Sequence, residues 1–135
     1  MTPDWLSDPK DRTAAAEGLR AAGEEALAAL AAGCALLAAA EDADADGIRA
    51  RLTAAGGPAD AFDATLERLR GDATVADDEA LATVRAVKGD AALAQRLARA
   101  CCALAAHDGD LSPAQTAAAR RLCEALNLSP TQFGL

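Results

Sequence analysis

Residues 24–40 read E-E-A-L-A-A-L-A-A-G-C-A-L-L-A-A-A, and this stretch indicates the fold class of the chain. Alanine and leucine, which fill most of it, lead the ranking of helix propensity. Its large apolar side chains recur every three or four residues, the spacing of one face of an α-helix: Leu27, Leu30, Cys34 and Leu37. We therefore predict a helix over 24–40, preceded by an N-terminal segment, residues 1–23, with a weaker helix at 11–22.

The same periodicity continues to the C-terminus. The expected elements are a short helix after Asp46, a helix from Pro58 to Gly71, one over 77–88, one capped by Asp90 that runs to Asp108, one that starts at Ser112, and a last turn at 129–135. Three valines and one isoleucine among 135 residues are too few to build a sheet. The sequence predicts an all-α fold, a compact bundle of about seven helices, in which residues 24–135 form one domain.

The charge balance bears on the class of ligand. The chain carries 13 Lys and Arg against 21 Asp and Glu, a net charge of -8. Nucleic-acid binding needs clustered basic residues, so we expect no nucleic-acid partner. Cations or a basic partner surface suit such a chain better. Because 40 of its residues are alanine, each buried side chain contributes little area, and we expect a modest stability that a bound ion or partner would raise.

The thiols and the N-terminus bear on location. The chain begins Met-Thr-Pro-Asp-Trp, without a basic region followed by an apolar stretch, so no secretory signal is expected. The most apolar stretch, residues 26–40, is too short to span a bilayer, which argues against membrane insertion. We therefore expect a cytoplasmic protein with four reduced thiols: Cys34, Cys101, Cys102 and Cys123.

One segment occurs twice, at an offset of 66 residues. Residues 36–47 read L-L-A-A-A-E-D-A-D-A-D-G, and residues 102–113 read C-A-L-A-A-H-D-G-D-L-S-P. Each copy is an alanine-rich helix, then D-x-D, then the expected start of a new helix, at Asp46 in the first copy and at Ser112 in the second. This echo predicts two pseudo-repeated units of helix, acidic turn and helix.

The four aspartates of these turns are the candidate metal ligands: Asp42, Asp44, Asp108 and Asp110. Closely spaced carboxylates suit hard cations such as Ca²⁺ and Mg²⁺. A true EF-hand is not expected, because the twelfth position of its loop is Thr53 instead of a glutamate. The other interpretation is that these aspartates only cap helices and interact with their dipoles. The sequence leaves both open.

Catalytic chemistry finds little support. His107 is the only histidine, and no nucleophile and base can be paired around it by spacing. At the end of a helix it is more simply explained by the helix dipole. Ser112-Pro113-Ala114-Gln115 has the pattern of a capping box with proline at the first helical position. We predict that Ser112 is a structural residue and that the protein is not an enzyme.

Residues 102–113, followed by R-R-L-C-E-A-L-N-L-S-P-T-Q-F-G-L at 120–135, resemble the tellurite-resistance TerB family. That family has an alanine-rich helix ending in A-D-G-x-x-S-P, then an amphipathic helix leading to L-G-L. Asp108, Gly109, Ser112 and Pro113 match the motif, and residues 126–128 stand for the terminal element. The first acidic turn resembles the earlier copy of the motif that the family carries.

The resemblance implies an all-helical TerB-like module in tellurite or metal-stress response. It also implies integral membrane or other stress-response proteins as partners, and a location at the inner membrane face. From the residues we expect acidic turns that take a divalent cation or a basic partner surface. The alternative is a helical protein-interaction scaffold without an ion site. Whether the chain forms a homodimer is left open.

Overall fold

The structure is a computed structural model that describes residues 23–40, 43–106 and 111–133. Over these ranges it contains six α-helices, one 3₁₀-helix and no strand. They are α2 (Glu24–Ala38), α3 (Ala45–Ala54), α4 (Ala59–Gly71), α5 (Ala73–Arg85), α6 (Ala91–Ala105), α7 (Pro113–Ala125) and η2 (Pro130–Phe133). The all-α fold is thus confirmed, whereas the helix expected at 11–22 lies outside the described residues.

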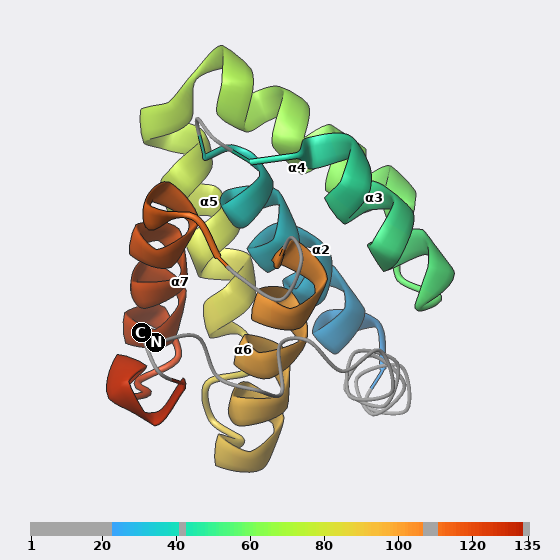
Figure 1. Cartoon of the computed structure of the whole chain (residues 1–135). Coiled ribbons are helices and arrows are strands. Elements are labelled where there is room, and N and C mark those ends of the chain that lie inside the picture. The colour runs from blue at the N-terminus through green and yellow to red at the C-terminus, as the bar shows by residue number, and fades with distance from the viewer. Residues whose placement is uncertain (1–22, 41–42, 107–110, 134–135) are drawn as a thin grey trace.

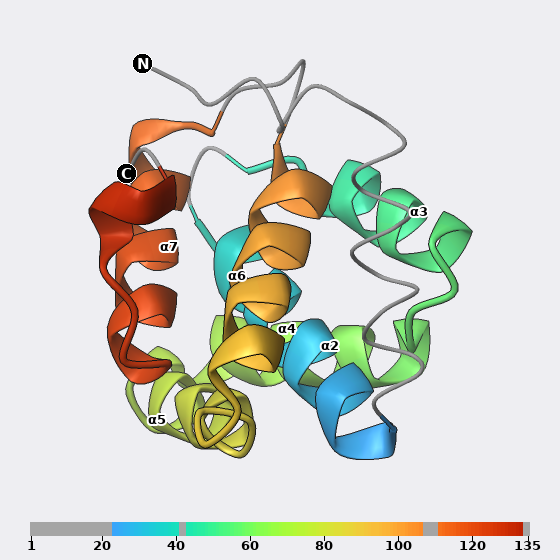
Figure 2. The same ribbon diagram turned by 90° about the horizontal axis from the view of Figure 1, so that it is seen from below.

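Helix α2 lies at the centre of the bundle and contacts α3, α4, α5, α6 and α7. Figures 1 and 2 show α6 beside α2, with α7 and α3 on opposite sides of this pair. Residues 29–38 of α2 are all buried, and five of these ten residues are alanines. A helix that is apolar all round can only be stable when neighbours cover every face, and the other five helices do so.

Small residues allow α2 and α6 to approach closely. A Cβ atom built on Gly33 of α2 would lie 2.5 Å from Sγ of Cys101 on α6, closer than real Cβ contacts. The same sulfur lies 3.8 Å from the carbonyl oxygen of Leu30, at the geometric limit of a thiol hydrogen bond. The missing side chain at Gly33 therefore sets how near these two helices come.

Most expected helices lie close to their expected positions, but three starts differ. We expected the fifth helix over 77–88, and α5 begins at Ala73. Asp77, at that expected start, lies inside α5 and pairs with Arg121 of α7, and Glu79 of α5 pairs with Arg68 of α4. Pro58, expected as the first helical residue of α4, is its N-cap.

The third difference concerns the acidic repeat. We expected Asp46 to begin the short third helix, matching Ser112. Instead α3 begins at Ala45, because the side chain of Asp44 accepts the hydrogen bond from the backbone N–H of Gly47. Asp46 lies in the first turn with an exposed side chain. The two helix starts are therefore out of register with the offset of 66, and the pseudo-repeat is not confirmed.

Candidate functional site

The start of α3 explains the glycine of the D-x-D-x-D-G pattern. The Asp44 carboxylate accepts from the backbone N–H of Gly47 at 3.1 Å, which satisfies one of the free donors of the first turn. A Cβ atom on Gly47 would lie 2.6 Å from Oδ2 of Asp44. With a Cβ at this position the Asp44 carboxylate would have to turn away from its present place, so Gly47 suits the cap that begins α3.

The start of α7 is the capping box that the sequence predicted. Oγ of Ser112 accepts from the backbone N–H of Gln115 at 3.1 Å, and Oε1 of Gln115 accepts from the backbone N–H of Ser112 at 3.0 Å. Both bonds of the box are present, with Pro113 at the first helical position. The assignment of Ser112 as a cap is confirmed.

Both of these helices also reach the C-terminal end of α6. Nε of Arg51, on α3, donates to the carbonyl oxygen of Leu104 at 2.7 Å. Nε2 of Gln115, on α7, donates to the carbonyl oxygen of Ala105 at 3.1 Å, and Gln115 is only 3% exposed. The last carbonyls of a helix have no partner within it. Two side chains from opposite sides of the bundle therefore hold the end of α6, directly before the second acidic segment.

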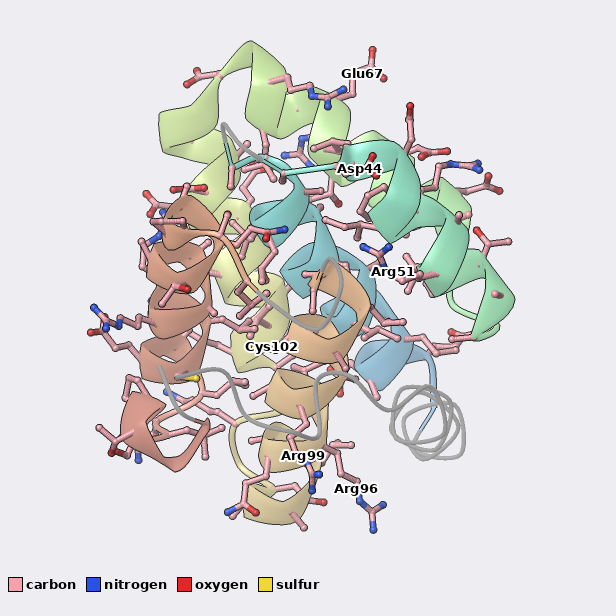
Figure 3. The ribbon with its side chains drawn as sticks, in the orientation of Figure 1. Asp44, Arg51, Glu67, Arg96, Arg99 and Cys102 are labelled. Carbon is pink, nitrogen blue, oxygen red and sulfur yellow. The ribbon has the colours of Figure 1, made fainter. Side chains whose placement is uncertain are left out.

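The start of α3 and the end of α6 meet around the guanidinium of Arg51. Its Nη1 atom lies 3.3 Å from the position that a Cβ of Gly47 would take, and the Asp44 carboxylate approaches the same position. Arg51 is partly buried, and its Nη2 atom is inaccessible to solvent. In Figure 3 its side chain lies between α3 and α6. We call Asp44, Gly47, Arg51 and the carbonyl of Leu104 the α3–α6 junction.

Of the four predicted metal ligands, only Asp44 falls within the described residues. Asp42, Asp108 and Asp110 lie outside them, as does His107. Asp44 is exposed and serves as the cap of α3. Over the described part of the chain, no group of three or more His, Cys, Asp or Glu side chains is arranged to hold a metal ion.

The four cysteines gather in the interior between α2, α6 and α7, and all are buried and free. A hydrogen bond with the Cys34 thiol, followed by burial, raises the pKa of Cys101 well above its usual value. Burial likewise raises the pKa of Cys102, and raises that of Cys123 to about 11. The expected core positions of Cys34 and Cys101 are confirmed. With raised pKa values, the thiols of Cys101, Cys102 and Cys123 stay protonated and unreactive at neutral pH.

A groove of about 250 Å³ lies between α3 and α4. Ala45, Phe62 and Leu66 contribute its apolar part, and charged side chains surround it: Asp46, Arg49, Asp63, Glu67 and Arg70. Arg49 crosses from α3 to α4 and binds both carboxylate oxygens of Asp63, at 2.8 and 3.1 Å from Nε. This pair raises the pKa of Arg49 and lowers that of Asp63.

The sequence analysis did not predict that Arg51 and Gln115 bind the terminal carbonyls of α6. Arg51 and its acceptor are 53 residues apart, and no local pattern links them. Gln115 was recognised from the capping box, but its bond to Ala105 was not foreseen. The signal that could have found both is the rule that terminal carbonyls need donors.

Within the described ranges, no helix combines the length and the apolar character needed to cross a bilayer. Comparisons with protein-family models, with curated proteins and with solved structures gave no match to this chain.

Proposed function

We propose that this chain is a non-enzymatic, TerB-like module of tellurite or metal-stress response, whose acidic turns bind a positively charged group. That group is a divalent cation such as Ca²⁺ or Mg²⁺, or a basic residue on a partner surface. The site residues are Asp42, Asp44, Asp108 and Asp110. The partners are integral membrane or other stress-response proteins, met at the cytoplasmic side of the membrane.

One observation supports a cation-binding role above the others. The first acidic turn ends at Asp44, the second begins two residues after Ala106, and the guanidinium of Arg51 bridges the two helix ends that flank them. The negative end of the α6 dipole and the Asp44 carboxylate both favour a positive group at this place. The same negative potential supports the proposal, and the charge of Arg51 offsets part of it, so a bound ion would be held only weakly.

The test is a thermal melt of the protein with Ca²⁺, Mg²⁺, Mn²⁺ or Zn²⁺ against the same protein in chelator. We expect weak binding, with dissociation constants of about 10⁻⁴–10⁻³ M, and a modest rise in melting temperature. The double variant Asp108→Asn, Asp110→Asn should lose this rise and be as stable as the wild type, or slightly more so, without metal.

The second candidate is a helical scaffold that binds partners without an ion site. The groove between α3 and α4 supports it, since apolar side chains there are surrounded by exposed charges. This candidate takes over if metals shift neither protein and the double aspartate variant melts far below the wild type. Such a result would mean that the aspartates only stabilise helix ends.

A further inference from the structure

We propose that the groove between α3 and α4 is a docking surface for a basic segment of a partner protein, which inserts a lysine or arginine side chain between the two helices. The inference rests on the second candidate function, the scaffold that binds partners, and deepens it by naming the chemistry of the partner. It uses only residues of α3 and α4, and it is independent of any ion at the acidic turns.

The first step is the shape of the groove. It measures about 250 Å³ and lies between two helices that pack against each other. Ala45 of α3 forms its apolar part together with Phe62 and Leu66 of α4, whose side chains are only 1% and 7% exposed. Because these two larger side chains belong to the core, the apolar lining is in place before a partner arrives. A segment that packs into such a groove gains apolar contact at little cost in order.

The second step is the balance of charge along the groove. Arg49 binds Asp63 through both carboxylate oxygens, so this pair neutralises itself. Asp46 and Glu67 are exposed, and neither of them forms an ion pair with another described residue. The same holds for Arg70, the remaining charged side chain of the lining. Two carboxylates against one guanidinium leave an excess of negative charge for a partner to meet.

The surroundings of Arg49 indicate the same excess. Its pKa is raised mainly by the hydrogen bond and the charge of Asp63, and further by the charges of Asp60 and Asp46. Three carboxylates therefore act on one guanidinium beside the groove. Such a region attracts positive side chains and repels acidic ones, and the net charge of -8 adds a long-range attraction for basic partners.

The third step is the match between the groove and a basic side chain. Lysine and arginine lay their aliphatic stems along apolar surface while their charged heads stay in water. The stem would lie on the lining at Leu66, and the head would meet the carboxylates of Asp46 and Glu67. Glu67 points outward from the bundle in Figure 3, where a partner can reach it. An acidic side chain would find an opposite charge only at Arg70.

The experiment titrates three synthetic peptides into the full-length protein labelled with ¹⁵N and follows its backbone amide signals. The first peptide is an amphipathic helix of lysines and leucines. The second has glutamates in place of the lysines, and the third has serines in place of the leucines. We expect the lysine–leucine peptide to shift the signals of Ala45, Arg49 and Leu66, and to bind about tenfold more tightly than either of the others.

Variants assign the binding to the groove. Asp46→Asn combined with Glu67→Gln should weaken binding of the lysine–leucine peptide about tenfold, because two ion pairs are lost. Asp78→Asn combined with Glu124→Gln is the matched control, since it removes the same charge from exposed positions of α5 and α7 and should change binding by less than about twofold. Arg70→Gln removes a positive charge from the groove and should tighten binding about two- to threefold.

Circular dichroism checks that each variant is folded. If the double variant at Asp46 and Glu67 does not fold, Glu67→Lys replaces it, because it changes a single exposed residue of α4. The new lysine would repel the basic peptide, so the expected loss of binding is again about tenfold.

The outcomes that overturn the inference differ from those that overturn the scaffold function. If the glutamate peptide binds the groove as tightly as the lysine–leucine peptide, the groove takes partners of another chemistry, and only the inference is wrong. Equal weakening in the control variant would assign the binding to the net charge of the chain. Groove signals that move with protein concentration alone would show that a second copy of the chain occupies the groove instead. If no peptide shifts the groove signals, both the inference and the scaffold function are wrong.

Discussion

Helices α3 and α7 hold the end of α6 in two different ways. Each follows an acidic stretch, begins with a side-chain cap and supplies one donor to a terminal carbonyl of α6. On the α7 side the donor is the neutral amide of Gln115, which is buried and also completes the capping box. On the α3 side the donor is the charged guanidinium of Arg51, beside an exposed carboxylate.

The difference teaches which side is fixed and which is adjustable. A buried amide with all its bonds within the protein responds little to salt, ions or partners, because water does not compete for it. A guanidinium near an exposed carboxylate interacts with charged ions and side chains that come close to it, and dissolved salt weakens these interactions. The α7 side is therefore a structural joint, whereas the α3 side has an exposed carboxylate and a guanidinium beside the end of α6.

The largest expected effect is a loss of folding stability at alkaline pH, which acts through the thiols of α6 and α7. The folded-state pKa values of Cys101, Cys102 and Cys123 lie above the 9.0 of an unperturbed thiol. The stabilisation is therefore complete below pH 9 and is lost as the pH rises towards the folded-state values. Each thiol costs about 1.4 kcal/mol per pH unit in that window. Melting curves from pH 7.5 to 10.5 measure this, and parallel curves for Cys102→Ala and the wild type would contradict it.

The substitution Gln115→Leu should cost about 3 kcal/mol. It removes the donor to Ala105 and the acceptor for the N–H of Ser112, and buried groups without partners cost about 1–3 kcal/mol each. Urea unfolding measures the loss. The same change at Gln95, an exposed residue of α6, is the control and should be nearly neutral. Equal effects at the two positions would show that the joint on the α7 side is not what stabilises the fold.

On the α3 side, Gly47→Ala should cost about 1–2 kcal/mol, because the new Cβ would push the Asp44 carboxylate out of its cap. An alanine normally stabilises a helix relative to glycine. Gly71→Ala is the control, since no atom lies within 4 Å of the added carbon. Chemical denaturation of both variants tests the sign, and a stabilising Gly47→Ala would rule out the steric account of this glycine.

The smallest expected effect concerns the α7 cap itself. Ser112→Ala should cost about 1 kcal/mol, and Ser112→Asp should remain close to the wild type, because aspartate caps a helix equally well. Thermal melts of the two variants compare them. A strong loss in Ser112→Asp would contradict the cap assignment, despite the two bonds that form the box.

Local patterns in the sequence predicted most of the fold. The side chain of Asp90 caps α6 by accepting from the N–H of Leu93, and the capping box starts α7, both as expected. These features depend on residues a few positions apart. The expected start of α5 was wrong by four residues, because the helix was placed on the spacing of its large apolar side chains, and the ion pairs that Asp77 and Glu79 make with other helices cannot be read from the sequence.

The candidate site was less predictable for the same reason. The aspartates stand out as a local pattern, but the junction depends on Arg51 and Leu104, which are distant in sequence. Of the four thiols, only Cys34 and Cys101 were expected in the core, because both belong to rows of apolar residues at helical spacing. Such a row does not specify which residues become neighbours in the core. The ion-binding role itself stays a prediction.

The central position of α2 has a consequence for how the chain acquires its structure. This helix is synthesised early, yet the partners that cover it include α6 and α7, which begin more than 50 residues after it ends. Helices α3, α4 and α5 cover part of its surface, but the faces that pack against α6 and α7 stay uncovered until these helices are made. During synthesis α2 therefore remains incompletely covered until α6 and α7 have emerged from the ribosome. The closing of the core is a long-range event, which slows folding relative to bundles whose sequential helices are neighbours.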